Sequence, residues 1–129
     1  IVIRGNILDI GEGDFTQSIF MRNEEVDTGH AGVEMFYRNI LIENNVIINA
    51  HSHGITVGET AGLVIRNNSI LHDDGNLPDG ADDGVEVPCI TVSTTSSGVV
   101  ITQNLTSTIV GFTGQANWSG SSLASPRRS

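Results

Sequence analysis

Runs of three aliphatic residues recur along the chain, and each is followed by a polar residue, a small or amide residue and an asparagine. Four segments share this pattern: Ile1-Val2-Ile3-Arg4-Gly5-Asn6, Ile40-Leu41-Ile42-Glu43-Asn44-Asn45, Leu63-Val64-Ile65-Arg66-Asn67-Asn68 and Val99-Val100-Ile101-Thr102-Gln103-Asn104. Aliphatic and β-branched residues bounded by Gly and Asn favour strands, and no stretch keeps a convincing helical period. The pattern therefore predicts one short strand type that is repeated four times.

The spacing of the repeat predicts a solenoid. Its final asparagine recurs at positions 6, 45, 68 and 104, so the shortest spacing is taken as a bare coil and the two longer ones contain insertions. We expect an all-β fold, a right-handed parallel β-helix of about four coils with two long loop insertions, over residues 1–110. Residues 111–129 are rich in Gly and Ser and should form a loosely held tail. We expect the whole to be a piece of a longer chain.

Stacked coils about 4.8 Å apart would place equivalent side chains on top of one another. Because side chains alternate along a strand, two rows should point into the core. These rows are Ile1, Ile40, Leu63 and Val99, and Ile3, Ile42, Ile65 and Ile101. The four asparagines should form a ladder of amide hydrogen bonds at a bend. On the outer face, Arg4, Glu43 and Arg66 alternate in charge, which favours their stacking.

The outward phase of the same strands also carries an apolar stripe, formed by Val2, Leu41, Val64 and Val100. A contiguous apolar row on the outside of an acidic protein usually marks a covered surface. Either the tail covers the stripe, or a second copy of the chain does. Because the Gly and Ser content of the tail disfavours an ordered cover, we expect a homo-oligomer that associates through this stripe.

A second strand type follows the bend. The pattern of Gly, apolar, polar and apolar residues occurs at 32–35, 54–57 and 84–87, and it places Glu34, Thr56 and Glu86 in one outward stack. A competing register for the third coil uses Cys89-Ile90-Thr91-Val92, and the sequence leaves the two open.

The insertions concentrate the ionisable residues. Residues 9–31 and 72–86 contain 12 of the 15 acidic residues, and all four histidines lie in them or in the turn between them. We expect both insertions to leave the coil at the same corner and to flank the turn at 49–53, where loops on a rigid scaffold often carry function.

This arrangement suggests candidate catalytic and binding residues. Two carboxylates two coils apart would be roughly 10 Å from each other, which admits a water between an acid and a base. His53 between Glu34 and Glu86 could then act as a proton shuttle, and these three are the predicted catalytic residues. The predicted substrate-binding residues are His30, Tyr37, Arg38, His51 and Thr56. The alternative is that outward Glu and His at a solenoid corner are simply solvated.

The second insertion also offers oxygen ligands for a cation. Asp73, Asp74, Asp79, Asp82 and Asp83 lie among glycines that allow tight turns, a composition suited to Ca²⁺. The segment does not match the twelve-residue calcium loop of helix–loop–helix proteins, so an ordinary acidic loop is the alternative.

Composition and net charge exclude some classes of binding partner. The net charge of −9 repels phosphate backbones, which argues against nucleic acid. No apolar run approaches the roughly 20 residues of a membrane span, which argues against a membrane partner. The single Cys89 excludes an internal disulfide framework.

The stretch 39–71, with Ile42-Glu43-Asn44-Asn45-Val46-Ile47 and Ile65-Arg66-Asn67-Asn68-Ser69-Ile70, resembles the parallel β-helix repeat of pectate lyases, alginate epimerases and many secreted bacterial proteins. The resemblance implies an extracellular or cell-surface domain that binds a polysaccharide. It also allows a polysaccharide lyase, epimerase or glycoside hydrolase, in which Arg22 or Arg38 would be the cation that offsets a substrate carboxylate. The alternative is a non-catalytic stalk or adhesion segment of a larger secreted protein, stiffened by calcium.

Overall fold

The structure, a computed structural model, describes residues 1–10, 17–22, 36–49, 52–72, 87–112 and 117. The regular elements in these residues are strands, and every pairing between them is parallel. The described residues contain no helix with the length and apolar character that a membrane crossing requires.

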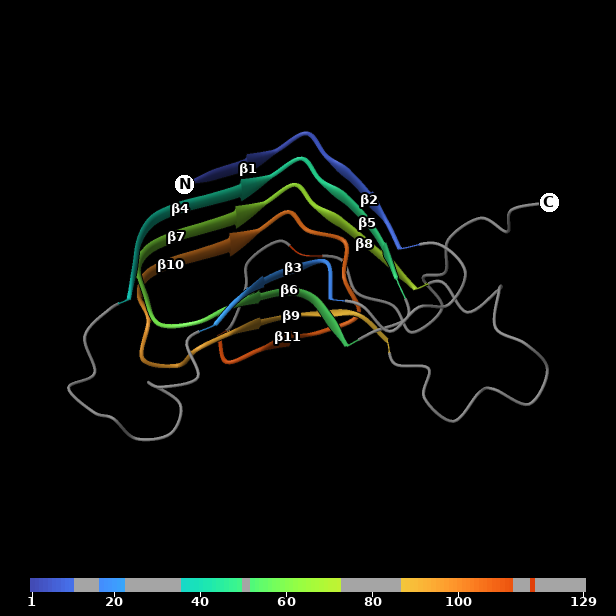
Figure 1. Cartoon of the computed structure of the whole chain (residues 1–129). Helices are drawn as coiled ribbons and strands as arrows, with labels where there is room; N and C mark the ends of the chain where they lie inside the picture. Colours follow the sequence, from blue (N-terminus) through green and yellow to red (C-terminus); the bar gives the residue numbers. More distant parts are fainter. Residues whose placement is uncertain (11–16, 23–35, 50–51, 73–86, 113–116, 118–129) are drawn as a thin grey trace, which may run out of the picture.

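Three parallel sheets form the walls of the solenoid (Figure 1). Sheet A has the order β1 (Val2–Arg4), β4 (Tyr37–Glu43), β7 (Thr60–Arg66) and β10 (Ser97–Thr102). Sheet B has the order β2 (Ile7–Asp9), β5 (Val46–Asn49) and β8 (Ser69–His72). Sheet C has the order β3 (Ile19–Met21), β6 (His53–Val57), β9 (Cys89–Val92) and β11 (Ile109–Val110). The chain visits A, B and C in turn and returns to A beside its previous strand, which confirms the predicted all-β parallel β-helix.

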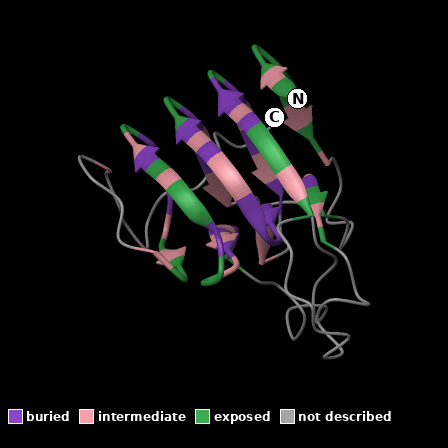
Figure 2. Ribbon diagram, turned by 90° about the vertical axis from the view of Figure 1, so that its left-hand side faces the viewer, coloured by how far each residue is buried: buried purple, intermediate pink, exposed green. Residues whose placement is uncertain are grey.

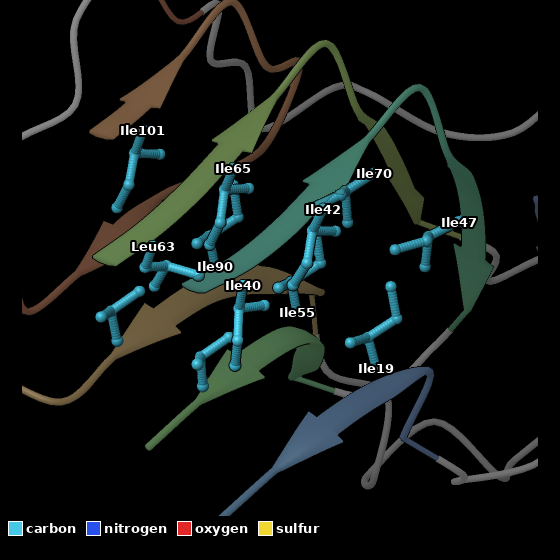
Figure 3. Close-up of a cluster of buried hydrophobic side chains, with 12 residues drawn as sticks. Ile19, Ile40, Ile42, Ile47, Ile55, Leu63, Ile65, Ile70, Ile90 and Ile101 are labelled. Carbon is cyan, nitrogen blue, oxygen red and sulfur yellow. The ribbon is translucent and has the colours of Figure 1, made fainter. Parts of the chain in front are cut away.

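The core lies between the three sheets and consists mainly of isoleucine (Figure 3). Hydrophobic side chains with at most 1% exposure come from all three sheets: Ile40, Ile42, Ile47, Ile55, Val57, Leu63, Ile65, Ile70 and Ile90. Alternation within each strand sends every second residue inward, as the sequence predicts for sheet A. In the edge strands β1 and β10, Ile3 and Val99 are only partly buried against this core, and Ile1, which precedes β1, is 66% exposed instead of buried. Figure 2 likewise shows more burial in β4 and β7 than in the edge strands β1 and β10.

The predicted asparagine ladder is confirmed at the bend between sheets A and B. Each amide nitrogen donates to the next Oδ1 over 2.9–3.0 Å, through Asn6, Asn45, Asn68, Asn104 and finally Asn117. The backbone N–H beside each donating amide bonds to the same oxygen, and inner amides also donate to a strand carbonyl of the previous coil. Asn117, which the sequence assigned to the tail, is therefore part of the ladder.

The outward charge row is also confirmed. The Nε atoms of Arg4 and Arg66 each lie 2.6 Å from a different carboxylate oxygen of Glu43. The hydrogen bond from Arg66, then that from Arg4, lowers the pKa of Glu43 below its ordinary value of 4.5. The apolar stripe has the predicted register beside this row, with Val2 58% and Val100 49% exposed at its two ends.

The stacking predicted for sheet C is wrong in two coils. Thr56 pairs with Phe20 on one side and Thr91 on the other, so Glu34 and Glu86 do not stack beside it, and the competing register through Cys89 is the observed one. The misleading signal was Gly54, which lies at a β-bulge. A Cβ atom there would be 2.8 Å from Ile70 Cγ2, so this coil needs glycine for a local close approach that the others do not repeat.

The first predicted insertion, residues 9–31, contains β3 and is therefore divided between two corners of the solenoid. Residues 10–18 connect β2 of sheet B to β3 of sheet C, which is the corner at which residues 73–88 connect β8 to β9. Residues 22–36 connect β3 of sheet C to β4 of sheet A, so the prediction of one shared corner is wrong for this part. The turn at 49–53 belongs to the same corner as residues 10–18 and 73–88.

Candidate functional site

A groove of about 350 Å³ lies on the outer side of sheet C, toward the corner that leads to sheet A. Residues of all four coils line it, so the groove crosses the strands and follows the stacking direction. Its lining consists of Arg22, His53, Thr56, Val57, Gly58, Glu59, Thr91, Val92, Ser93, Thr94, Val110 and Gly111. Guanidinium, imidazole, carboxyl and hydroxyl groups thus converge on one concave surface, which is the usual form of a ligand site.

The register of sheet C determines which side chains face the groove. Ile55, Val57, Ile90 and Val92 belong to the core, so the residues between them point outward. The outward row across the coils is Phe20, Thr56, Thr91 and Val110. Phe20 is 39% exposed at one end of this row, and the two threonine hydroxyls lie in its middle.

His53 and Thr56, two of the predicted site residues, come together in this groove. His53 Nδ1 and Thr56 Oγ1 are 2.7 Å apart, and the ring of Phe20 meets the imidazole edge to face with 5.0 Å between centroids. Because one ring nitrogen is bonded to a neighbouring hydroxyl, the orientation of the imidazole is fixed. The arrangement presents a positioned imidazole at one end of the groove, next to an aromatic surface.

Glu59 is a site residue that the sequence reasoning missed. It lies in the turn between β6 and β7, lines the groove and is only 6% exposed. Its Oε1 atom accepts a hydrogen bond of 2.9 Å from Ser93 Oγ, whereas its buried Oε2 atom has no hydrogen-bond partner among the described residues. Most acidic residues of the sequence lie in the two insertions, whereas Glu59 is an isolated acid in a two-residue turn of the bare coil.

Tyr37 and Arg38 begin β4 and lie apart from the row of threonines. Tyr37 is half-buried against the core, and its ring is near Gly58, where a Cβ atom would be 3.5 Å from Tyr37 Cε2. Arg38 is exposed in sheet A, where it pairs with Ala61. Of the two arginines proposed as the cation of a sugar site, Arg22 lines the groove and Arg38 does not.

The remaining predicted site residues lie outside the described part of the chain. These are His30, Glu34, His51, Glu86 and the proposed calcium ligands Asp73, Asp74, Asp79, Asp82 and Asp83. Their roles stay predictions. Within the described ranges, no three His, Cys, Asp or Glu residues are grouped so that they could hold a metal ion.

Comparison with known protein families decides the handedness and the family. Residues 4–123 match the family described as "Right handed beta helix region". The chain belongs to the right-handed β-helix family. This handedness agrees with the rule that parallel crossover connections are right-handed. No curated protein and no solved structure matches this β-helix.

Proposed function

We propose that this right-handed β-helix is an extracellular or cell-surface domain that binds a polysaccharide in the groove of sheet C. The observation that carries the proposal is the composition of the groove, in which hydroxyl, imidazole, carboxyl and guanidinium groups lie beside exposed Phe20. A sugar ring presents hydroxyl groups at its edge and an apolar face. Hydrogen-bonding side chains next to an aromatic surface are complementary to both.

The direction of the groove supports a polymeric ligand. Because equivalent residues of successive coils are about 4.8 Å apart, an extended chain that follows the stacking direction meets a new set of side chains at each coil. Thr56 and Thr91 are such neighbours, and the turns that follow them add Glu59 and Ser93 to the same wall. A linear polysaccharide can therefore make repeated contacts that a single sugar cannot.

The contacts favour binding over a chemical step. The acid–base pair predicted for a lyase, epimerase or glycoside hydrolase depends on Glu34 and Glu86 stacking beside Thr56, and Phe20 and Thr91 occupy those two positions. His53 is nevertheless positioned by Thr56, so any modification of a bound sugar would depend on this imidazole. The alternative function is the non-catalytic, calcium-stiffened stalk, which requires no polysaccharide at the groove.

The experiment is a panel of neutral and anionic polysaccharides, measured by calorimetry for binding and by product analysis for unsaturated or epimerised sugars. Thr91→Val removes one groove hydroxyl without changing the shape, and Thr102→Val makes the same change on sheet A. One lost hydrogen bond of about 0.5–1.5 kcal/mol weakens binding roughly 2- to 12-fold in the Thr91 variant. The Thr102 variant should bind like the wild type.

Two results would overturn the proposal. Absence of binding by the wild type across the panel would leave the stalk as the better account. Binding that is equally insensitive to Thr91→Val and Thr102→Val, or equally weakened by both, would place the ligand elsewhere on the solenoid.

A further inference from the structure

We propose that Glu59 is the specificity-determining residue of the groove and that its carboxyl group turns toward the ligand, so that Oε2, which is buried in the free protein, accepts a hydrogen bond from a hydroxyl group of the bound polysaccharide. The inference rests on the proposed function and deepens it. It identifies the wall of the groove that recognises the ligand and the chemical group that this wall requires, a hydrogen-bond donor.

The first observation is that the two carboxyl oxygens of Glu59 differ in their hydrogen bonding. Oε1 of Glu59 accepts from Ser93 Oγ over 2.9 Å, but Oε2 is buried and accepts from no group in the part of the chain that the structure describes. Leaving a buried acceptor unpaired costs free energy, and almost all buried polar groups in native proteins avoid this cost. A ligand in the groove that donates a hydrogen bond to Oε2 would remove this cost, which explains why the unpaired acceptor is kept beside the groove.

The second observation is that the turn cannot easily move to relieve this cost. The carbonyl of Glu59 accepts from Tyr37 N over 3.0 Å, which ties the turn to the start of β4 in the second coil. Thr60 N donates to Ser96 Oγ over 3.1 Å, which ties it to the third coil. Glu59 is therefore held between two neighbouring coils, as a preorganised binding residue should be.

Gly58 shows how tightly the same turn packs. Its N–H donates to Met21 O over 2.6 Å, and a Cβ atom at this position would lie 3.2 Å from that oxygen. The backbone before Glu59 is thus fixed against the first coil, next to Arg22, and the backbone after it is fixed by the bond from Thr60 N to Ser96 Oγ. A side chain mounted on this backbone has little freedom to find another partner within the protein.

The surroundings of Glu59 indicate a hydroxyl-bearing ligand. Ser93 Oγ, which donates to Oε1, also lies 3.0 Å from Thr95 Oγ1, so the hydroxyls of this corner are engaged with one another. A sugar hydroxyl both donates and accepts, and it can donate to Oε2 while a neighbouring hydroxyl accepts from another group of the groove. The carboxyl group thus selects for a donor at one defined place along the polysaccharide.

The test compares two substitutions of Glu59 with one of its neighbour. Glu59→Leu removes both oxygens at similar volume, and Glu59→Gln keeps an acceptor for Ser93 while placing an N–H₂ donor where Oε2 lies. Ser93→Ala is the control, because it removes the partner of Oε1 and leaves Oε2 in place. Each variant is titrated with the polysaccharide that the wild type binds, and its melting temperature is measured without ligand.

We expect Glu59→Leu and Glu59→Gln to lower the affinity at least tenfold, and Ser93→Ala to lower it less. The melting temperature of Glu59→Leu should stay unchanged or rise, since an unpaired buried acceptor is removed. A residue with a purely structural role would give the opposite pattern, a lower melting temperature with unchanged affinity.

The failure of this inference differs from the failure of the proposed function. If Thr91→Val weakens binding while both Glu59 variants bind like the wild type, the groove binds the polysaccharide and the role of Glu59 is refuted. If the wild type binds no polysaccharide, the proposed function fails and this inference fails with it. If Glu59→Leu does not fold, the Glu59→Gln titration decides alone.

Discussion

Asn45 Nδ2 donates to Asn68 Oδ1 over 2.9 Å, and the same nitrogen donates to the carbonyl of Ile3 over 3.0 Å. One side chain thereby joins three coils. Asn45→Ala should lower the free energy of unfolding by about 1–3 kcal/mol, because it leaves buried groups of the neighbouring coils without partners. Urea denaturation followed by circular dichroism measures the loss.

The end of the ladder provides the control for this prediction. Asn6 is exposed and bonds only toward Asn45, so Asn6→Ala should cost clearly less than Asn45→Ala. Equal losses at the two positions would mean that the ladder does not stabilise the fold through buried hydrogen bonds.

The ion pairs of Glu43 predict a pH dependence. The hydrogen bonds from Arg66 and Arg4 lower the pKa of Glu43 in the folded protein below its ordinary value of 4.5. A lowered folded pKa gives a contribution that is present above the unfolded pKa and is lost as the pH falls through the folded pKa. The wild type should therefore lose more stability than Glu43→Gln on acidification below pH 4.5. Identical pH profiles of unfolding for the two proteins would contradict this.

Two glycines with positive φ should lose different amounts of unfolding free energy when each is replaced by alanine. Gly111 has a φ of +99°, and a Cβ atom there would lie 2.0 Å from Val92 O, whereas Gly5 has a φ of +69° and no atom within 4 Å. Gly5→Ala should cost only the backbone strain, about 1–2 kcal/mol. Gly111→Ala should cost more, since β11 must also move away from β9. Denaturation midpoints of both variants check this, and a smaller loss at Gly111 would contradict the close approach.

The apolar stripe of sheet A predicts weak self-association. One row of four side chains is less than the roughly 800 Å² that each partner buries in a stable complex, so association should appear only at high concentration. Val100→Glu should abolish it. Val110→Glu is the matched control, because Val110 is 50% and Val100 49% exposed but they lie on different sheets. Sedimentation velocity measures both, and a wild type that is strictly monomeric at high concentration would refute the homo-oligomer.

Sheet A could be predicted well from the sequence because each coil repeats the whole pattern within one short segment. Three aliphatics, a charged or polar residue and an asparagine determine core, outer face and bend together, and each coil repeats them. The ladder member Asn117 was not predictable in this way. In the sequence it is not directly preceded by three aliphatic residues, although its Oδ1 atom accepts from Asn104 Nδ2 in the stack.

Sheet C was harder to predict because its strands share only an apolar–polar–apolar alternation. Gly54 suggested a marker for the strand start, although the bulge and the approach of Ile70 require it in one coil alone. The residues that line the groove therefore differ in part from those predicted. His53 and Thr56 were found because they lie on the strand with the correct register, whereas Glu59 depends on an unpaired oxygen that only three-dimensional packing reveals.

The most direct test of polysaccharide binding by sheet C is an amide chemical-shift titration of the isotope-labelled protein with an oligosaccharide fragment of the best ligand in the panel. We expect the amide shifts of Gly58, Glu59, Thr91 and Ser93 to change with ligand concentration, while those of Leu41, Val64 and Val100 on sheet A stay constant. Changes confined to sheet A, or no change with any fragment, would contradict polysaccharide binding by sheet C.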